Sequence, residues 1–294
     1  LPYQETDCVQ RGIAQSQQAY ETEMLEDMLE RTSENDWIFD VGMNIGNHTV
    51  CLAANGRKVC GFEANPKMME LAQINIALNH LQERVQLHCC GISDREERAS
   101  FGAEIPSNFG AMRLQQTQDG EIMCHSLDSF DFPESIAMMK IDIEGMEDKA
   151  LRGAKNLIKK HRPILYVEAQ KHEEIREVDR LLVASKYVHC NVFGTSTTHL
   201  YIPREKASAQ DLQRNLSIPV GNENELRRKT LFNFFTYQRR NDSIVSFGDK
   251  QRLGFLRFLP TYLVALLCAR RYYWYWRNDI RMFVYCISFG LIKR

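Results

Sequence analysis

The sequence predicts an α/β fold, with a mostly parallel sheet, an antiparallel last strand and helices on both faces. Two observations support this prediction. Strand-like and helix-like patterns alternate along residues 37–203 of the 294-residue chain, which is typical of parallel strands joined by helical crossovers. The last two strand patterns are separated by three polar residues, which leave no room for a helix, so we expect an antiparallel hairpin there.

The individual elements follow from hydrophobic periodicity and length. Short apolar runs predict strands, and longer amphipathic stretches predict helices. Strands are expected at 37–41, 58–63, 84–90, 137–142, 163–169, 187–194 and 198–203, and helices at 16–31, 47–55, 67–79, 147–160 and 172–185. The polar stretch 91–126 shows neither period and is predicted to be irregular.

Composition divides the chain into four parts. We expect a helical cap (1–35), the α/β domain (36–203), a variable accessory region (204–250) and a basic aromatic tail (251–294). Residues 252–294 hold eight Lys or Arg against one acid, and eleven of the chain's 29 aromatic residues. The tail's uncharged runs are shorter than the ~20 residues of a membrane-spanning helix. Two interpretations stay open: peripheral contact with an anionic membrane, or an extra helical layer.

Charge and cysteine content narrow the class of protein. A formal net charge of −1 gives no electrostatic reason to expect a nucleic-acid partner. The nine cysteines include no CxxC pair, and Cys60, Cys89 and Cys190 lie in apolar strand-like runs. Buried free thiols in a reducing compartment are therefore favoured over disulfides. No signal peptide is apparent, although the sequence begins at Leu1 and an upstream segment could be missing. We expect a cytoplasmic protein, associated with membranes if the tail binds them.

A glycine-rich turn, DVGMNIG, follows the first predicted strand and precedes a helix. Ligands of parallel α/β proteins bind at the carboxyl ends of strands. Gly42 and Gly46 permit positive φ angles and leave room for a ligand to approach the backbone. The turn therefore predicts a ligand site at this end of the sheet.

The residues between and beside these glycines favour one ligand over another. A dinucleotide site requires G-x-G-x-x-G, but Asn44 and Asn47 stand at the second and third glycine positions. Asp40, at the end of the strand, would repel a pyrophosphate and attract a cation. S-adenosylmethionine carries an ammonium and a sulfonium, so it is favoured over a nicotinamide dinucleotide.

Two further strand ends add polar candidates. Glu63 ends the next strand, where an acid can hydrogen-bond the hydroxyls of a ribose. Ser93 or Asp94, after the third strand, could face the adenine edge, although Ser-Asp is also an ordinary turn sequence. The alternative for the first two acids is that Asp40 caps the helix and Glu63 is a solvated loop residue.

Six motifs occur in order within residues 36–203: DVGMNIGNHT, GFEANP, NIALN, GISD, MKIDIEGMEDKALRGA and PILYVEAQ. Together, in this order, they resemble the FkbM family of S-adenosylmethionine-dependent methyltransferases. The resemblance implies the class I methyltransferase fold, a Rossmann-like sheet of seven strands with an antiparallel last strand. It also implies O-methylation of a hydroxyl on a sugar, polyketide or other small molecule.

The resemblance assigns residues to the cosubstrate. Four would surround its methionine part and one would hold its ribose: Asp40, Gly42, Asn44, Gly46 and Glu63. Asp142 would line the cleft between cosubstrate and acceptor. The sequence departs from the family at Met43, where relatives have Ala, and at Ala64, where they have Pro. Met43 would project near the ligand and narrow the pocket, although its thioether is adaptable.

Acids at two later strand ends are the candidates for catalysis. An alcohol is a weak nucleophile, so a general base or a metal should help to remove its proton. Asp142 or Glu144 is the first choice, and Glu168 follows. Strand alternation puts Lys140 on the same face as Asp142, where it would lower the pKa of that acid and make it a poorer base. Alternatively, Glu144 and Glu147 only stabilise the start of the next helix.

We expect no required metal, although an Asp/Glu pair could bind Mg²⁺. The predicted function is S-adenosylmethionine-dependent O-methylation of a small-molecule or glycan acceptor. The alternatives are a non-catalytic or membrane-recruited module that keeps the fold, and an NAD-type oxidoreductase, against which the missing glycines argue.

Overall fold

The computed structural model describes residues 1–102, 112–132, 134–194 and 197–214. The predicted tail and most of the accessory region lie outside these residues, so the four-part division stays a prediction. Among the helices of the described part, none is long and apolar enough to cross a membrane.

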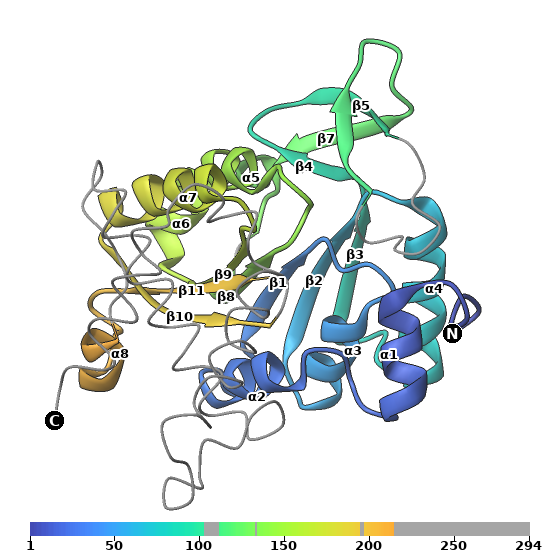
Figure 1. The fold of residues 1–294 in the computed structure, drawn as a ribbon, viewed down its shortest axis with the longest axis horizontal. Coiled ribbons are helices and arrows are strands. Elements are labelled where there is room, and N and C mark those ends of the chain that lie inside the picture. Colours follow the sequence, from blue (N-terminus) through green and yellow to red (C-terminus); the bar gives the residue numbers. More distant parts are fainter. Residues whose placement is uncertain (103–111, 133, 195–196, 215–294) are drawn as a thin grey trace, which may run out of the picture. The chain divides into compact units, whose positions relative to one another are not determined.

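The centre of the fold is a seven-stranded sheet (Figure 1). Its strands, in spatial order, are β10 (Tyr187–Phe193), β11 (Thr198–Pro203), β9 (Ile164–Glu168), β8 (Ile136–Ile141), β1 (Trp37–Val41), β2 (Lys58–Glu63) and β3 (Val85–Cys89). β1 pairs in parallel with β2 and β8, whereas β11 is antiparallel to both of its neighbours. The predicted mostly parallel sheet with an antiparallel last strand is therefore confirmed, and β11 inserts between β9 and β10.

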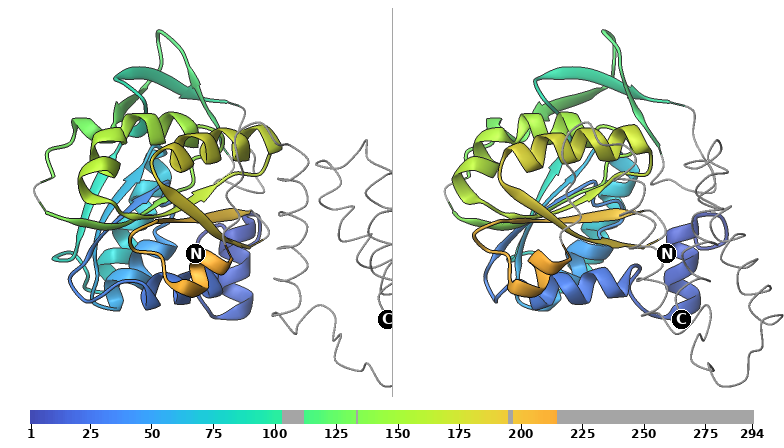
Figure 2. Two further views of the ribbon diagram at one scale, coloured as in Figure 1. Left: turned by 90° about the vertical axis from the view of Figure 1, so that its left-hand side faces the viewer. Right: turned by 60° about the vertical axis from the view of Figure 1, so that its left-hand side comes forward.

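Helices cover both faces of this sheet (Figures 1 and 2). One face carries α2 (Thr22–Glu30), α3 (Asn47–Ala54) and α4 (Pro66–Leu78), and the other carries α5 (Glu147–Gly153), α6 (Lys155–His161) and α7 (His172–Ala184). The remaining helices are α1 (Cys8–Ser16), α8 (Ala209–Gln213) and the 3₁₀ turn η2 (Leu127–Ser129). Two-sided coverage explains why β1 is buried at every residue and lacks polar–apolar alternation.

A second, four-stranded sheet corrects the prediction that 91–126 is irregular. Its order is β4 (Gly91–Ser93), β7 (Ile122–Ser126), β5 (Glu97–Phe101) and β6 (Leu114–Gln116). Strands of three to five residues in a polar sequence are too short for periodicity to show. This small sheet follows β3 directly and stands beyond the carboxyl edge of the large sheet (Figure 1).

Two predicted helices differ from those of the structure. The helix expected at 16–31 is shorter, since it corresponds to α2 alone, and α1 before it was not predicted. In the connection between them, Gln17 and Glu21 both have left-handed φ angles. The helix expected at 147–160 is divided into α5 and α6, which meet at Ala154. Gly153, the last residue of α5, lies against β4, where a Cβ would meet the Ser93 carbonyl oxygen at 2.2 Å.

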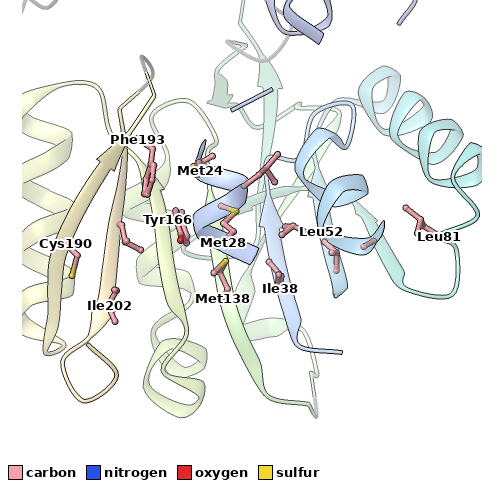
Figure 3. Close-up of a cluster of buried hydrophobic side chains, with 14 of the residues drawn as sticks. Met24, Met28, Ile38, Leu52, Leu81, Met138, Tyr166, Cys190, Phe193 and Ile202 are labelled. Atoms are coloured by element: carbon pink, nitrogen blue, oxygen red, sulfur yellow. The ribbon is translucent and has the colours of Figure 1, made fainter. Parts of the chain in front are cut away.

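Helix α2 is docked on the large sheet through both apolar and polar contacts. Met24 and Met28 are buried in one cluster with Ile38 of β1 and Met138 of β8 (Figure 3). Beside this cluster, the Tyr166 hydroxyl of β9 donates to the Asp27 carboxylate of α2. Helix α2 is therefore part of the core, and its position over the sheet is fixed.

Gly42 should be the most sensitive glycine of the β1 turn. Its φ is +82°, and a Cβ there would lie 1.8 Å from the Asp142 carbonyl oxygen, so Gly42→Ala must displace backbone. We expect a loss of about 2–4 kcal/mol in the free energy of unfolding, measured by urea denaturation. The control is Gly12→Ala in α1, where a Cβ meets only Tyr20 at 3.6 Å. Equal stability of the two variants would contradict the close approach.

Candidate active site

A cleft opens at the carboxyl ends of β1, β2, β8 and β9, between the N-terminal helices and the small sheet. Six of the predicted site residues line it: Gly42, Asn44, Glu63, Asp142, Glu144 and Glu168. The other lining residues were not predicted: Cys8, Val9, Tyr20, Glu21, Val41, Phe62, Ala64, Asn65, Met68, Cys90, Gly91, Ile92, Phe101, Met112, Leu114, Ile143 and Met146. The empty volume, open mouth included, is about 990 Å³.

The β1 turn supplies backbone donors to the cleft. Asn44 has a φ of +53°, and its N–H donates to Glu63 Oε2 at 2.8 Å. Its side-chain Oδ1 is buried and accepts no hydrogen bond from the described residues. Gly46 also has a positive φ, as predicted, but it faces Ala72 of α4 and does not line the cleft.

Glu63 is held at the end of β2 by two backbone groups. Each carboxylate oxygen accepts one N–H, from Asn44 at 2.8 Å and from Asn65 at 2.7 Å. Burial raises the pKa of Glu63 to about 7, and the charge of Asp40 adds to this, although the two hydrogen bonds oppose it. The carboxylate is therefore oriented before any ligand arrives.

Behind the cleft, the side chain of Lys140 lies between two carboxylates. Its Nζ is 3.1 Å from Asp142 Oδ2 and 3.6 Å from Asp40 Oδ1. Asp40 is fully buried, accepts a hydrogen bond from Thr49 Oγ1 at 2.7 Å and does not line the cleft. The structure thus places Asp40 one layer behind the ligand space, where it can act on a ligand only through its neighbours.

Asp142 and Glu168 face each other and titrate as a pair. Burial disfavours ionised Asp142, but Lys140 and a hydrogen bond with Glu168 outweigh burial and lower its pKa. Burial and the charge of Asp142 raise the pKa of Glu168 to about 11. At neutral pH the pair therefore carries one proton, which resides on Glu168.

Glu144 has an unusual backbone conformation and a raised pKa. Its φ of +55° is unusual for a residue other than glycine. Burial raises its pKa to about 7, with further contributions from Asp142 and Glu147. Glu147, by contrast, turns back to accept the N–H groups of Ile143 and Gly145. The alternative of a stabilised helix start thus applies to Glu147, whereas Glu144 lines the cleft.

Ser93 and Asp94, predicted to face adenine, are not brought to the cleft. Ser93 is fully buried, and its hydroxyl donates to Glu97 Oε1 at 2.6 Å within the small sheet. The apolar wall at this end comes from neighbouring residues instead: Cys90, Gly91, Ile92, Phe101 and Leu114. The GISD motif identified the right loop. In the small sheet that includes it, however, the Ser93 hydroxyl and the Asp94 carboxylate do not line the cleft.

Met43 was expected to narrow the ligand pocket, and the structure corrects this. It is 2% exposed and packs with Met69 and Ala72 of α4 in a small core cluster. A Cβ on Gly61 of β2 would lie 2.5 Å from the Met43 sulfur, so the missing side chain of Gly61 provides its space.

Residues from the N-terminal cap also line the cleft, and the sequence analysis missed them. Tyr20 and Glu21 belong to the connection between α1 and α2, which periodicity had placed inside one helix. Burial raises the pKa of the Tyr20 phenol to about 12, and the nearby acids Glu21, Asp142 and Glu168 contribute. Two polar residues, Asn47 and His48, begin the otherwise apolar helix α3. This pair could have indicated that the start of α3 has polar contacts with another segment of the chain.

Three cleft carboxylates lie close enough together to hold a cation. One oxygen each of Asp142, Glu144 and Glu168 lies within 4.8 Å of the others. Oxygen-only ligands suit Mg²⁺ or Ca²⁺, but the Lys140 ammonium already supplies positive charge at Asp142. The absence of a required metal stays a prediction.

The fold and the site together define a class I methyltransferase. Its cleft lies at the carboxyl ends of the central strands β1, β2, β8 and β9. The family model of the methyltransferase FkbM domain matches residues 40–189, about half of the chain. The chain belongs to the FkbM methyltransferase family.

Individual relatives are more distant. The hexuronic acid methyltransferase AglP of Haloferax volcanii is 26% identical over 174 residues, which cover 56% of this chain and 69% of that protein. The crystal structure of an FkbM methyltransferase from Methylobacillus flagellatus matches with a TM-score of 0.46 and 20% identity, over 58% of this chain and 44% of that one. A tRNA (uracil-54, C5)-methyltransferase of Pyrococcus abyssi matches with a TM-score of 0.38 and 14% identity, over 61% and 36% of the two chains.

Lys140→Met should destabilise the protein strongly, because it leaves the buried Asp40 and the partly buried Asp142 without their cation. Lys140 holds the pKa of Asp142 below its ordinary value, so this stabilisation is present above about pH 4 and is lost as the pH falls through the depressed pKa. We expect a deficit of about 3–5 kcal/mol at pH 7 that shrinks only below about pH 4, measured by urea denaturation.

Lys149→Met is the matched control for this charge removal. Lys149 pairs with Glu97 at 3.4 Å, but its side chain is 33% exposed, so we expect a loss below about 1 kcal/mol. A deficit of Lys140→Met that does not depend on pH would contradict the electrostatic explanation.

Proposed function

We propose that this chain is an S-adenosylmethionine-dependent O-methyltransferase that acts on a hydroxyl of a sugar or other small molecule. The observation that carries the proposal is a single cleft with two chemically distinct ends. One end has apolar walls and an oriented acid, Glu63. The other has three acids whose pKa values differ widely, as acid–base chemistry requires.

The residues of the first end fit S-adenosylmethionine. Glu63 would accept the ribose hydroxyls, and the wall from Cys90 to Ile92 would enclose the adenine. Gly42 and Asn44 would lie along the methionine part. The buried Oδ1 of Asn44 has no donor among the described residues, which suits a ligand that carries an ammonium. When bound, this cosubstrate supplies the electrophilic methyl group.

At the other end, Glu144 is the group best suited to accept the proton of the acceptor hydroxyl. A pKa of about 7 lets it be ionised at neutral pH and still basic enough to take a proton. Asp142 is ionised but its pKa is lowered, and Glu168 carries a proton, so neither is as effective a base. Asp142 and Glu168 would orient the acceptor by accepting and donating hydrogen bonds.

A hydroxylated acceptor is supported by the relative as well as by the acids. AglP is described as a hexuronic acid methyltransferase, which makes a sugar or glycan the first class to test. The in-line transfer itself needs only close positioning of the hydroxyl oxygen and the methyl carbon. The acids of the cleft would position the hydroxyl by hydrogen bonds. The transfer needs no oxidant or reductant.

Glu63→Ala should weaken S-adenosylmethionine binding at least tenfold, or about 1.4 kcal/mol, because two hydrogen bonds to a charged acceptor are lost. Isothermal titration calorimetry measures this directly. Asp94→Ala, whose side chain does not line the cleft, should bind like the wild type. If Asp94→Ala loses affinity and Glu63→Ala does not, the proposed position of the ribose at Glu63 is wrong.

Glu144→Gln should lower kcat about 10²–10⁴-fold while leaving cosubstrate affinity unchanged, because only proton removal is affected. The assay is methyl transfer to sugars of a hydroxyl-bearing panel. With wild-type enzyme, kcat/KM should rise with pH and level off above about 7, as Glu144 loses its proton. Cosubstrate binding without turnover across the panel would instead favour a non-catalytic module.

A further inference from the structure

The connection between α1 and α2 forms a wall of the cleft next to the β1 turn. Tyr20 and Glu21 line the cleft from this connection, together with Cys8 and Val9 of α1. They reach it from outside the residues 40–189 that match the family model. The N-terminal segment therefore adds a wall to the cleft that lies outside the matched residues.

Polar contacts from the start of α3 hold this wall in place. Asn47 Oδ1 accepts the Tyr20 N–H at 2.9 Å, and Asn47 Nδ2 donates to the Tyr20 carbonyl at 3.0 Å. His48 Nε2 lies 3.3 Å from Glu21 Oε2. Glu21, the residue just before α2, has a left-handed backbone conformation with a φ of +57°.

Glu21 brings a negative charge to this part of the cleft. Burial disfavours its ionised form, but His48 and Lys140 outweigh burial and lower its pKa. Its side chain is 10% exposed. The charged residues of the cleft lining are all acids: Glu21, Glu63, Asp142, Glu144 and Glu168. Among the residues that line the described part of the cleft, the charged ones are thus suited to bind cations, and Lys140 behind them offsets part of their charge.

The order of the strands indicates which part of the cosubstrate would meet Glu21. With adenine beside Cys90 and ribose at Glu63, the ligand runs from β3 across β2 toward β1. Its amino-acid end then lies over the β1 turn and the first turn of α3. Glu21 is fastened to that same turn of α3 by His48.

We propose that Glu21 binds the α-ammonium group of S-adenosylmethionine, so that the N-terminal segment is part of the cosubstrate site. This inference rests on the proposed function. The Glu21 carboxylate accepts hydrogen bonds from the ammonium, and Asn44, which lines the same cleft, offers its Oδ1 as a second acceptor. Asn47 and His48 are positioning residues, which act on the ligand only through the segment that they hold.

Three forms of one product ligand test the proposal without knowledge of the acceptor. S-adenosylhomocysteine has both the ammonium and the carboxylate, its decarboxylated analogue keeps only the ammonium, and its deaminated analogue keeps only the carboxylate. Glu21→Gln should weaken binding of the first two at least about tenfold, because a charged hydrogen bond is lost, and should not weaken the third. Titration calorimetry gives all three dissociation constants.

The matched control is Glu26→Gln, which makes the same change at an exposed position of α2 and should leave all three constants as in the wild type. Equal weakening of all three ligands by Glu21→Gln, or no weakening, would overturn the proposal. The wild type gives a second test, because the proposal requires it to bind the decarboxylated analogue more tightly than the deaminated one. A folded wild type that binds none of the ligands would instead overturn the proposed function.

Discussion

The buried ammonium of Lys140 is the constraint on which the site depends. It lies between Asp40 of β1 and Asp142 after β8, so it pairs with two carboxylates at adjacent strand ends. Burial raises the pKa values of Glu168 and Glu144, and the charge of Asp142 raises both further. Three acids of the same kind thereby acquire three different pKa values. Burial and one cation placed by strand register together set the acid–base character of the acceptor side.

The turn after β1 serves two sides of the molecule. Its backbone faces the cleft, where the Asn44 N–H orients Glu63. Its continuation into α3 faces the N-terminal cap, which Asn47 fixes by two hydrogen bonds to Tyr20. Polar residues at the start of an otherwise apolar helix thus connect the cap to the sheet. This arrangement explains why the cap can contribute to the cleft as a fixed wall.

Much of the large sheet could be predicted, because each strand is a separate apolar run bounded by polar turns. The small sheet could not, since its strands are too short to show a period. Helix faces were also harder to assign. In α4, Ile74 and Leu78 have a helical spacing that fits a buried face, yet they are 47% and 72% exposed. The buried face is instead formed by Met68, Met69, Ala72 and Ile76. A helix with apolar residues on more than one side does not reveal from its sequence which side is buried.

The sequence by itself determined the topology, the FkbM resemblance and the strand ends at which acids gather, because these depend on local pattern and chain order. Only the tertiary structure decided which of those acids face the cleft. Strand register puts Asp40 behind Lys140. The Ser93 hydroxyl is hydrogen-bonded within the small sheet, and Met43 occupies the space beside Gly61 in the core. The cap is the clearest case. Tyr20 and Glu21 line the same cleft as Asp142 and Glu168, which are more than a hundred residues away along the chain, and no local pattern records that proximity.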